Sequence, residues 1–308
     1  MGKIVTAIVL FVFSTGLACA SQGLTIVALK SKGIPAEPYE AALLGFTDRL
    51  NSRDANARIT EHHLKSGKEE DLLALLRQIE SRKPDLVLTL GTPTARFAQE
   101  RIRNIPVVFT MVLNPEKSGI SLSGVSMDIP YETMLKNLKD MMPDRVKIGL
   151  VYSAQSDSLY KEVREATLKL DLKLVAKKID SEKEFPTAIE ALFTEIDWFL
   201  MLPDPHIYFP KSVEHLLRES LRRACPIIGL SSAYTRAGAL ISFDCNYTDL
   251  GEQTADVALS ILAQEKPPKT EVIGPRKITF SLNLLVAERL RITIPSETIK
   301  QANEVFGK

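Results

Sequence analysis

The sequence predicts an α/β protein made of two doubly wound, mainly parallel sheets. Short apolar and β-branched runs alternate with stretches of helical periodicity, which is the pattern of parallel strands covered by helices. The alternation restarts near residue 130, and it holds more strands than one open sheet accommodates comfortably. A closed eight-stranded barrel is the alternative, but the polar spacers at 118–123 and 231–238 break the regular succession that a barrel needs.

The expected elements of the first half follow from this alternation. Ala41, Leu44 and Leu50 share one face of the first helix, and the strands are short runs bounded by turn residues. The expected strands are Leu24–Leu29, Arg58–Leu64, Asp85–Leu90, Pro106–Met111 and Gly124–Met127. The helices expected between them are Glu37–Asn51, Lys68–Arg82 and Pro93–Arg103.

The second half repeats the pattern. The expected strands are Lys147–Tyr152, Lys173–Lys178, Trp198–Leu202, Pro226–Gly229, Ala239–Phe243 and Lys277–Ser281. The expected helices are Tyr131–Met141, Ser156–Leu170, Phe185–Thr194, Pro210–Ala224, Leu250–Gln264 and Leu284–Leu290. Neither half contains a tandem repeat or a low-complexity tract.

The composition is that of a soluble globular protein with balanced charge. The 308 residues include 39 Lys and Arg against 38 Asp and Glu, and 45% of them are hydrophobic. Nucleic acids and anionic membranes are recognised through a surplus of basic residues, so we expect neither as the main partner. After residue 20, no apolar run reaches the roughly 18 residues of a transmembrane helix.

The first twenty residues have the pattern of a secretory signal peptide. Lys3 gives a positive start, Ile4–Phe13 is apolar, and Ala18–Ala20 forms a cleavage site of the A-x-A type. We expect cleavage at its end and a periplasmic or extracellular mature protein. Two alternatives stay open, namely a buried N-terminal strand and a lipoprotein signal acylated at Cys19, which Gly16 fits poorly because a large aliphatic residue is expected there.

Export permits disulfides, but we predict that the two remaining cysteines are free. Cys225 opens one apolar run, and Cys245 closes the next. If these runs are neighbouring parallel strands, the two thiols lie at opposite ends of the sheet, which is too far apart for a disulfide.

Motifs for nucleotide binding, hydrolysis and metal ligation are missing from the sequence. It contains no G-x-G-x-x-G, G-x-x-x-x-G-K-[ST], G-x-S-x-G or C-x-x-C. His62 and His63 are adjacent on a predicted strand and therefore point to opposite faces, and His215 lacks H-E-x-x-H spacing. We therefore expect a protein that is not an enzyme and that needs neither cofactor nor metal.

Small polar residues follow the carboxyl ends of several predicted strands. Ligands of open α/β sheets bind at this edge, where helix N-termini also point. Thr92 is a good N-cap and Pro93 a good first helical residue. We expect the amides of Thr94 and Ala95, together with the two threonine hydroxyls, to hold a carboxylate. A plain helix cap is the alternative.

The second half offers comparable strand ends. Asp204 stands between two prolines that fix its backbone, so its carboxylate suits an ammonium or hydroxyl group, unless it merely begins a turn or helix. Tyr152 offers an aromatic wall or ordinary packing. Further strand ends carry Asn114, Asp128, Ser153, Ser231 and Asp244. Together these loops predict a cleft that is lined from two sides and binds a small molecule.

Several short stretches combine in a specific order and spacing. They are Pro84–Val87, Gly91–Ala95, Ile105–Phe109, Leu122–Ser126, Met142–Pro143, Ile148–Tyr152, Pro226–Gly229, Arg236–Leu240 and Tyr247–Gly251. In this order they resemble the extracytoplasmic substrate-binding proteins of ABC importers, in particular the tryptophan/tyrosine-type subgroup. The resemblance runs from about Leu24 to Pro295.

The resemblance implies the type I periplasmic binding protein fold, in which two Rossmann-like lobes are joined by three hinge segments and hold a solute between them. An ABC permease is the implied partner, and hinge closure is the implied motion. Crossings are implied near 127–129, 244–246 and 280–283. The implied division is a signal peptide at 1–20, lobe 1 at 24–127 plus 246–280, and lobe 2 at 128–245 plus 281–308.

Carried over by position, the resemblance implies an amino-acid-like ligand. Thr92 and Thr94 would hold its carboxylate, either Asp204 or Asp244 would meet its ammonium, and Tyr152 would stack on it. The implied ligand-binding set is Thr92, Thr94, Ala95, Asn114, Tyr152, Ser153, Asp204, Ser231 and Asp244.

Three departures from the family pattern concern the solute more than the fold. Asn114 replaces a common Asp, Leu202–Pro205 replaces a Pro-Thr-Asp-Asn run, and the loop Lys30–Lys32 is unlike the usual one. Two alternative functions stay open. One is a sensor that delivers its closed form to a membrane kinase or cyclase, and the other is a periplasmic enzyme on the same scaffold.

Overall fold

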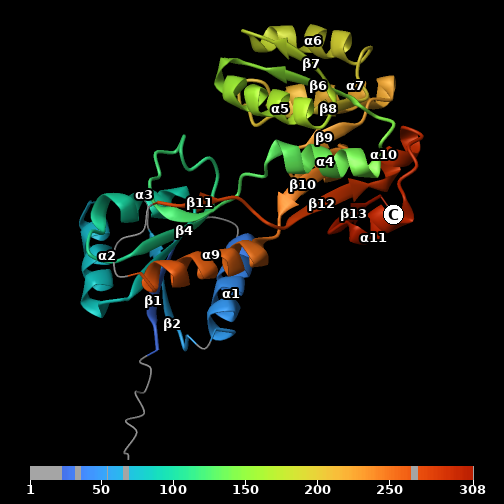
Figure 1. Ribbon diagram of the computed structural model, residues 1–308. Helices are drawn as coiled ribbons and strands as arrows, with labels where there is room; N and C mark the ends of the chain where they lie inside the picture. The colour runs from blue at the N-terminus through green and yellow to red at the C-terminus, as the bar shows by residue number, and fades with distance from the viewer. Residues whose placement is uncertain (1–22, 32–35, 54, 65–68, 265–269, 308) are drawn as a thin grey trace, which may run out of the picture.

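The computed structural model describes residues 23–31, 36–53, 55–64, 69–264 and 270–307. These residues form two mainly parallel sheets with helices on both faces, which confirms the predicted fold class (Figure 1). The predicted signal peptide and the acylation alternative at Cys19 lie outside the described residues. None of the described helices combines the length and apolar character that a membrane crossing requires.

The first sheet is wholly parallel and has the strand order β11-β5-β4-β3-β1-β2. Its strands are β1 (Thr25–Ser31), β2 (Arg58–Leu64), β3 (Leu86–Leu90), β4 (Val107–Val112), β5 (Ser123–Ser126) and β11 (Val272–Ile273). Its helices are α1 (Ala36–Asn51), α2 (Glu69–Arg82), α3 (Thr92–Arg101) and α9 (Tyr247–Leu262).

Alternating side chains of β1 build a core on each face of this sheet. Ile26 and Ala28 pack with apolar residues of α1 and α9, whereas Val27 and Leu29 pack with residues of α2 and α3. The alternation follows from the two-residue period of a strand. Because β1 lies inside the sheet and is covered on both sides, its sequence is a continuous apolar run.

The second sheet has the order β13-β12-β10-β9-β8-β6-β7, and only the pairing of β10 with β12 is antiparallel among its described pairs. Its strands are β6 (Lys147–Tyr152), β7 (Lys173–Lys178), β8 (Trp198–Leu200), β9 (Ile227–Gly229), β10 (Ile241–Cys245), β12 (Ile278–Asn283) and β13 (Glu304–Phe306). Its helices are α4 (Tyr131–Met141), α5 (Asp157–Lys169), α6 (Phe185–Leu192), α7 (Pro210–Arg223), α8 (Ser232–Ala237), α10 (Leu284–Arg289) and α11 (Ser296–Gln301).

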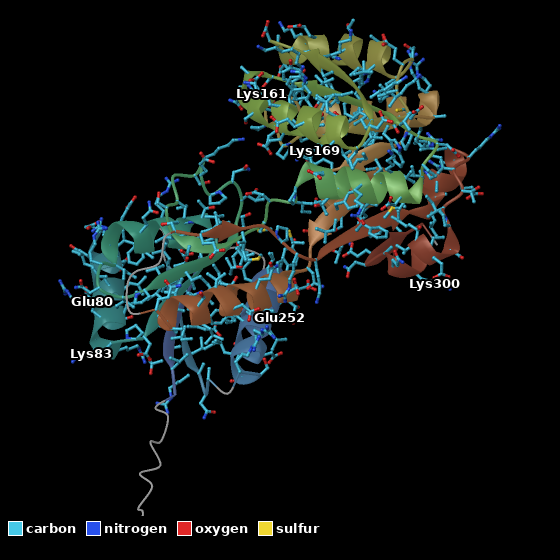
Figure 2. All side chains as sticks on the ribbon, in the orientation of Figure 1. Glu80, Lys83, Lys161, Lys169, Glu252 and Lys300 are labelled. Carbon is cyan, nitrogen blue, oxygen red and sulfur yellow. The ribbon has the colours of Figure 1, made fainter. Side chains whose placement is uncertain are left out.

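Charged side chains cover the outer faces of these helices. Figure 2 shows Glu80 on α2, Lys161 and Lys169 on α5 and Lys300 on α11 pointing away from the sheets. Both described cysteines, Cys225 and Cys245, are buried and free, as predicted.

Six short elements escaped prediction: α8, α11, β11, β13 and the 3-10 helices at Ala154–Ser156 and Glu182–Glu184. The helix α8 lies in the segment 231–238, which was expected to be a polar spacer. It was missed because six residues are too few to display a helical apolar period. β13 adds a parallel edge strand beside β12.

The chain passes between the sheets three times, after β5, after β10 and after β11. The strand β12 pairs with β10 from Ile278 onward, so residues 278–280 lie in the second sheet and the third passage precedes the expected 280–283. The expected crossing is displaced because β12 runs from Ile278 to Asn283, instead of from Lys277 to Ser281, and all six of its residues belong to the second sheet. The division into lobes stays a prediction at its other boundaries.

Candidate functional site

Three adjoining hollows lie beside the segments that cross between the two sheets. The acidic hollow, of about 430 Å³, is lined by Glu37, Pro38, Ala41, Ser232, 244–248, 279–281, Asn303 and Glu304. The tyrosine hollow, of about 320 Å³, is lined by Pro38, Tyr39, Thr92, Pro93, Met111, Leu113, Met127 and Tyr247. The crossing hollow, of about 180 Å³, is lined by Leu113, Asn114, 127–129, Tyr131, Met134, Leu159, Glu162, Leu200, Met201, Pro203, Gly229, Leu230 and Phe243.

Shared lining residues place the tyrosine hollow between the other two. It shares Pro38 and Tyr247 with the acidic hollow, and it shares Leu113 and Met127 with the crossing hollow. The residues that line the hollows follow strands of both sheets, at the carboxyl edge where α/β proteins bind ligands.

Thr92 lies at the first helical position of α3 and lines the tyrosine hollow. The N-cap is Gly91 rather than the predicted Thr92, and its φ of 94° is a conformation that favours glycine. A Cβ atom at Gly91 would lie 3.0 Å from the hydroxyl of Tyr39. This glycine therefore lets the Tyr39 ring approach the start of α3.

Thr94 and Ala95 face inward, which corrects their expected contacts. The Thr94 hydroxyl donates to the carbonyl oxygens of Leu90 and Gly91, both at 2.9 Å, and the side chain is fully buried. The amide of Ala95 donates to the carbonyl of Gly91 at 3.1 Å. The Thr94 hydroxyl and the Ala95 amide are therefore occupied by the first turn of α3, whereas the expected role of the Thr94 amide stays a prediction.

Asn114 and Asp128 line the crossing hollow together. The backbone N–H of Asn114 donates to both carboxylate oxygens of Asp128, each at 3.0 Å. Asn114 has a φ of 45°, a left-handed conformation that Asn tolerates better than most residues. Asp128 thus fixes the end of β4 to the first crossing segment.

Asp204 anchors a loop instead of facing the three hollows. It is 2% exposed, and its carboxylate accepts hydrogen bonds from the hydroxyls of Ser153 and Ser156, both at 2.6 Å, and from the N–H of His206 at 3.0 Å. Burial opposes the charged form, but these hydrogen bonds outweigh it and hold the pKa of Asp204 below its ordinary value. The Asp204 carboxylate therefore binds these three donors in place of the solute ammonium that was expected to contact it.

Tyr152, Ser153 and Ser231 line none of the three hollows, although both chain neighbours of Ser231, Leu230 and Ser232, do so. The Tyr152 ring stacks on Tyr160, with ring centroids 4.2 Å apart, and packs against the core of the second sheet. Ser153 lines a separate hollow of about 500 Å³ between the loops that follow β6, β7 and β8. Ser231 is the N-cap residue of α8.

Of the two carboxylates expected to meet the ammonium of the solute, Asp244 is the one that lines a hollow. It lies in the acidic hollow, where it accepts a hydrogen bond from the hydroxyl of Tyr247 at 2.8 Å. Burial raises the pKa of Asp244, and the nearby Glu304 raises it further. Beside it, the Cys245 thiol donates to the carbonyl of Met127 at 3.3 Å, which links two crossing segments.

Comparison with known proteins decides the family. Residues 36–306 match the family described as ABC transporter substrate binding protein. The chain belongs to this family. The resemblance stated from the sequence is thereby confirmed, and members of the family bind substrates outside the cytoplasm.

Relatives of this substrate-binding protein agree with the assignment. A tyrosine-binding protein of Clostridioides difficile (strain R20291) is 27% identical over 198 residues, which are 59% of this chain and 56% of that protein. The match thus spans little more than half of that relative's length.

Two solved structures share the fold. A ligand-free, open substrate binding protein with adhesive properties from Clostridium difficile has a TM-score of 0.75 and 22% identity, covering 92% of this chain and 100% of its own. An ABC domain in complex with L-Trp from Streptococcus pneumonia has a TM-score of 0.56 and 21% identity over the same shares.

Two aromatic residues of the hollows, Tyr39 and Tyr247, were not predicted from the sequence. Tyr39 and Tyr247 stand in the first turns of α1 and α9 and line the tyrosine hollow. Tyr247 is the first residue of one of the stretches that carry the family resemblance. It follows Asp244 by three residues, and this spacing could have indicated that the two side chains lie together. Among the described residues, no three His, Cys, Asp or Glu side chains gather as a metal site.

Proposed function

We propose that this protein is the extracytoplasmic solute receptor of an ABC importer and that it closes its two lobes on a small amino-acid-like solute. One observation carries the proposal: two of three adjoining hollows, the acidic and the crossing hollow, are lined by residues from elements of both sheets, in a chain of a substrate-binding family. The closed receptor then hands its solute to a permease, and the solute leaves unchanged.

Closure follows from contacts that need both lobes. The tyrosine hollow is lined by first-sheet elements alone, but the acidic and the crossing hollow take their lining from both sheets. We therefore expect a solute to reach its full set of contacts only when the sheets approach each other. Its higher affinity for that form shifts the population toward closure. The three crossing segments are the expected hinge, and the Cys245–Met127 hydrogen bond makes two of them move together.

The polar roles are assigned to groups that remain open to the hollows. Asp244, oriented by Tyr247, meets the ammonium of the solute. Thr92 provides a hydroxyl beside the N-terminus of α3 for the carboxylate, where the helix dipole favours negative charge. Asn114 lines the far end of the site.

The remaining residues of the expected set act in support. Asp204, Ser153 and Thr94 hold strand-end loops in place, as their hydrogen bonds indicate. Tyr39 and Tyr247 replace Tyr152 as the aromatic wall, since they line the central hollow.

The test is direct identification of the solute. The mature protein is purified under native conditions and gently denatured, and the released small molecules are identified by mass spectrometry. We expect an amino acid or a close analogue, which titrates back into the refolded protein with a stoichiometry of about one and is recovered unchanged. Chemical conversion of the added solute, or the absence of any solute that stabilises the protein, would contradict the proposal.

A further inference from the structure

The three hollows have a one-sided charge. Five carboxylates line them, and no Lys, Arg or His does so among the described residues. The acidic hollow contributes Glu37, Asp244 and Glu304, and the crossing hollow contributes Asp128 and Glu162.

Several carboxylates elsewhere in the described structure form ion pairs, unlike these five. Asp249, whose side chain is 3% exposed, pairs with Arg276 at 2.8 Å and with Lys277 at 3.1 Å. None of the five carboxylates of the hollows forms an ion pair with a described residue. The Oε2 atom of Glu304 is buried and has no hydrogen-bond partner in the described structure. A buried acceptor without a partner is costly, so this one points to a missing donor.

The carboxylates fall into two groups on either side of the tyrosine rings. Glu304 and Asp244 repel each other in the acidic hollow, and Asp128 and Glu162 both act on Tyr131 in the crossing hollow. The tyrosine hollow between them carries no charged residue. The faces of its rings attract cations, and its Met and Pro side chains suit a hydrocarbon chain.

A neutral amino acid leaves one of these groups unused. Its single ammonium satisfies one group of carboxylates, and its carboxylate is repelled by the other. A solute with a second cationic group satisfies both groups, and a hydrocarbon segment between its two charges lies over the tyrosine rings.

We propose that the solute carries a net positive charge, as an amino acid with a basic side chain or the corresponding diamine does. The inference rests on the proposed function, because it names the class of solute for the same cleft. One cationic group of the solute donates to Asp244 and Glu304, and the other donates to Asp128 and Glu162. Charge-assisted hydrogen bonds of this kind are stronger than neutral ones.

Calorimetric titration with matched solutes tests the charge. The solutes are lysine, norleucine (which has the four side-chain carbons of lysine without the ammonium), the diamine cadaverine and tyrosine, each at low and at high salt. We expect lysine to bind at least tenfold more tightly than norleucine and tyrosine, and we expect this advantage to shrink as salt rises. Norleucine or tyrosine binding as tightly as lysine would overturn the inference but leave the receptor function standing. If no solute binds, both fail.

Two variants test the residues. Glu162→Gln should weaken lysine binding severalfold and leave norleucine binding unchanged. Glu304→Gln should weaken the binding of both solutes, because each presents an ammonium to the group of Asp244 and Glu304. The matched control is Glu165→Gln, because Glu165 is also exposed on α5 but lines none of the hollows. If Glu304→Gln unfolds the protein, the exposed Glu162 still gives the answer, and equal losses for lysine and norleucine in Glu162→Gln would refute its role.

Discussion

At the scale of single residues, Asp204 and Asp244 have similar sequence contexts but different structural roles. Asp204 follows β8 and Asp244 lies near the end of β10, yet Asp204 is enclosed by hydroxyl donors whereas Asp244 lines the acidic hollow. The strand pattern predicted that each stands at a strand end. It did not predict which way each side chain points, because Ser and Asp residues in such loops compete to bond each other and the backbone.

Removing Asp204 should therefore destabilise the fold. Asp204→Ala leaves two serine hydroxyls and one N–H without their acceptor, so we expect a loss of about 3 kcal/mol in the free energy of unfolding. Urea denaturation measures it. The control is Asp180→Ala, at an exposed position after β7, which should cost less than about 0.5 kcal/mol. A stable Asp204→Ala protein would show that the loop does not depend on this carboxylate.

The two aspartates should also give opposite dependences of stability on pH. The pKa of Asp204 is lowered from 3.8, so its contribution is present above pH 3.8 and is lost as pH falls through the folded pKa. The pKa of Asp244 is raised from 3.8, so its contribution is present below pH 3.8 and is lost as pH rises through the folded pKa.

Substituting Asp244 should consequently separate stability from binding. Without solute, Asp244→Asn should be as stable as wild type or more so at about pH 7, because a buried charge is removed. Its affinity for the solute should fall about tenfold or more, which corresponds to the loss of one charge-assisted hydrogen bond. Denaturation and calorimetry on the same preparation measure both quantities, and an unchanged affinity would remove Asp244 from the site.

At the scale of elements, the third crossing segment is tied to α9 by a charge network. Arg276 donates to Asp249 and Glu252, and Lys277 pairs with Asp249 as well. Asp256 of the same helix pairs with Arg49 of α1 at 2.8 Å. The network holds the first-sheet end of this segment, so bending on closure is expected on the β12 side of Lys277.

Breaking the network should cost stability. In Arg276→Gln the nearly buried Asp249 keeps only Lys277, and we expect a loss of about 1–2 kcal/mol in the free energy of unfolding. Lys300→Gln is the matched control, because Lys300 and Glu297 form an exposed pair whose loss should cost less than about 0.5 kcal/mol. Thermal and urea denaturation compare the two, and equal losses would contradict the assigned difference.

Element types were predictable where a period repeats often enough to be visible. The ranges of α4, β2, β6 and β7 agree with the prediction at both ends. Short elements such as α8 and β13 carry no such period, and their formation depends on tertiary neighbours. The Asn283 amide, for example, donates to the carbonyl of Thr235 in α8 at 2.8 Å.

At the scale of the whole molecule, the alternation of strands and helices was sufficient to predict two sheets. It was not sufficient to predict which residues at the ends of the strands line the same hollow. The tyrosine hollow assembles side chains that lie far apart in the chain, among them Tyr39, Met127 and Tyr247. No local sequence pattern predicts that these residues contact the same hollow. It follows from the parallel order of the first sheet, whose strands β1, β3, β4 and β5 end at one edge, and from the return of the chain from β10 to α9, which adds Tyr247.

The central claim is that the two lobes close on a solute, and a distance between them tests it most directly. Labels at Glu80→Cys on α2 and Lys161→Cys on α5 report on the two sheets, and the native Cys225 and Cys245 are buried and should stay unlabelled. We predict that the label-to-label distance measured by pulsed electron spin resonance shortens when the solute identified by mass spectrometry saturates the protein. An unchanged distance distribution, with binding confirmed by calorimetry, would contradict the account.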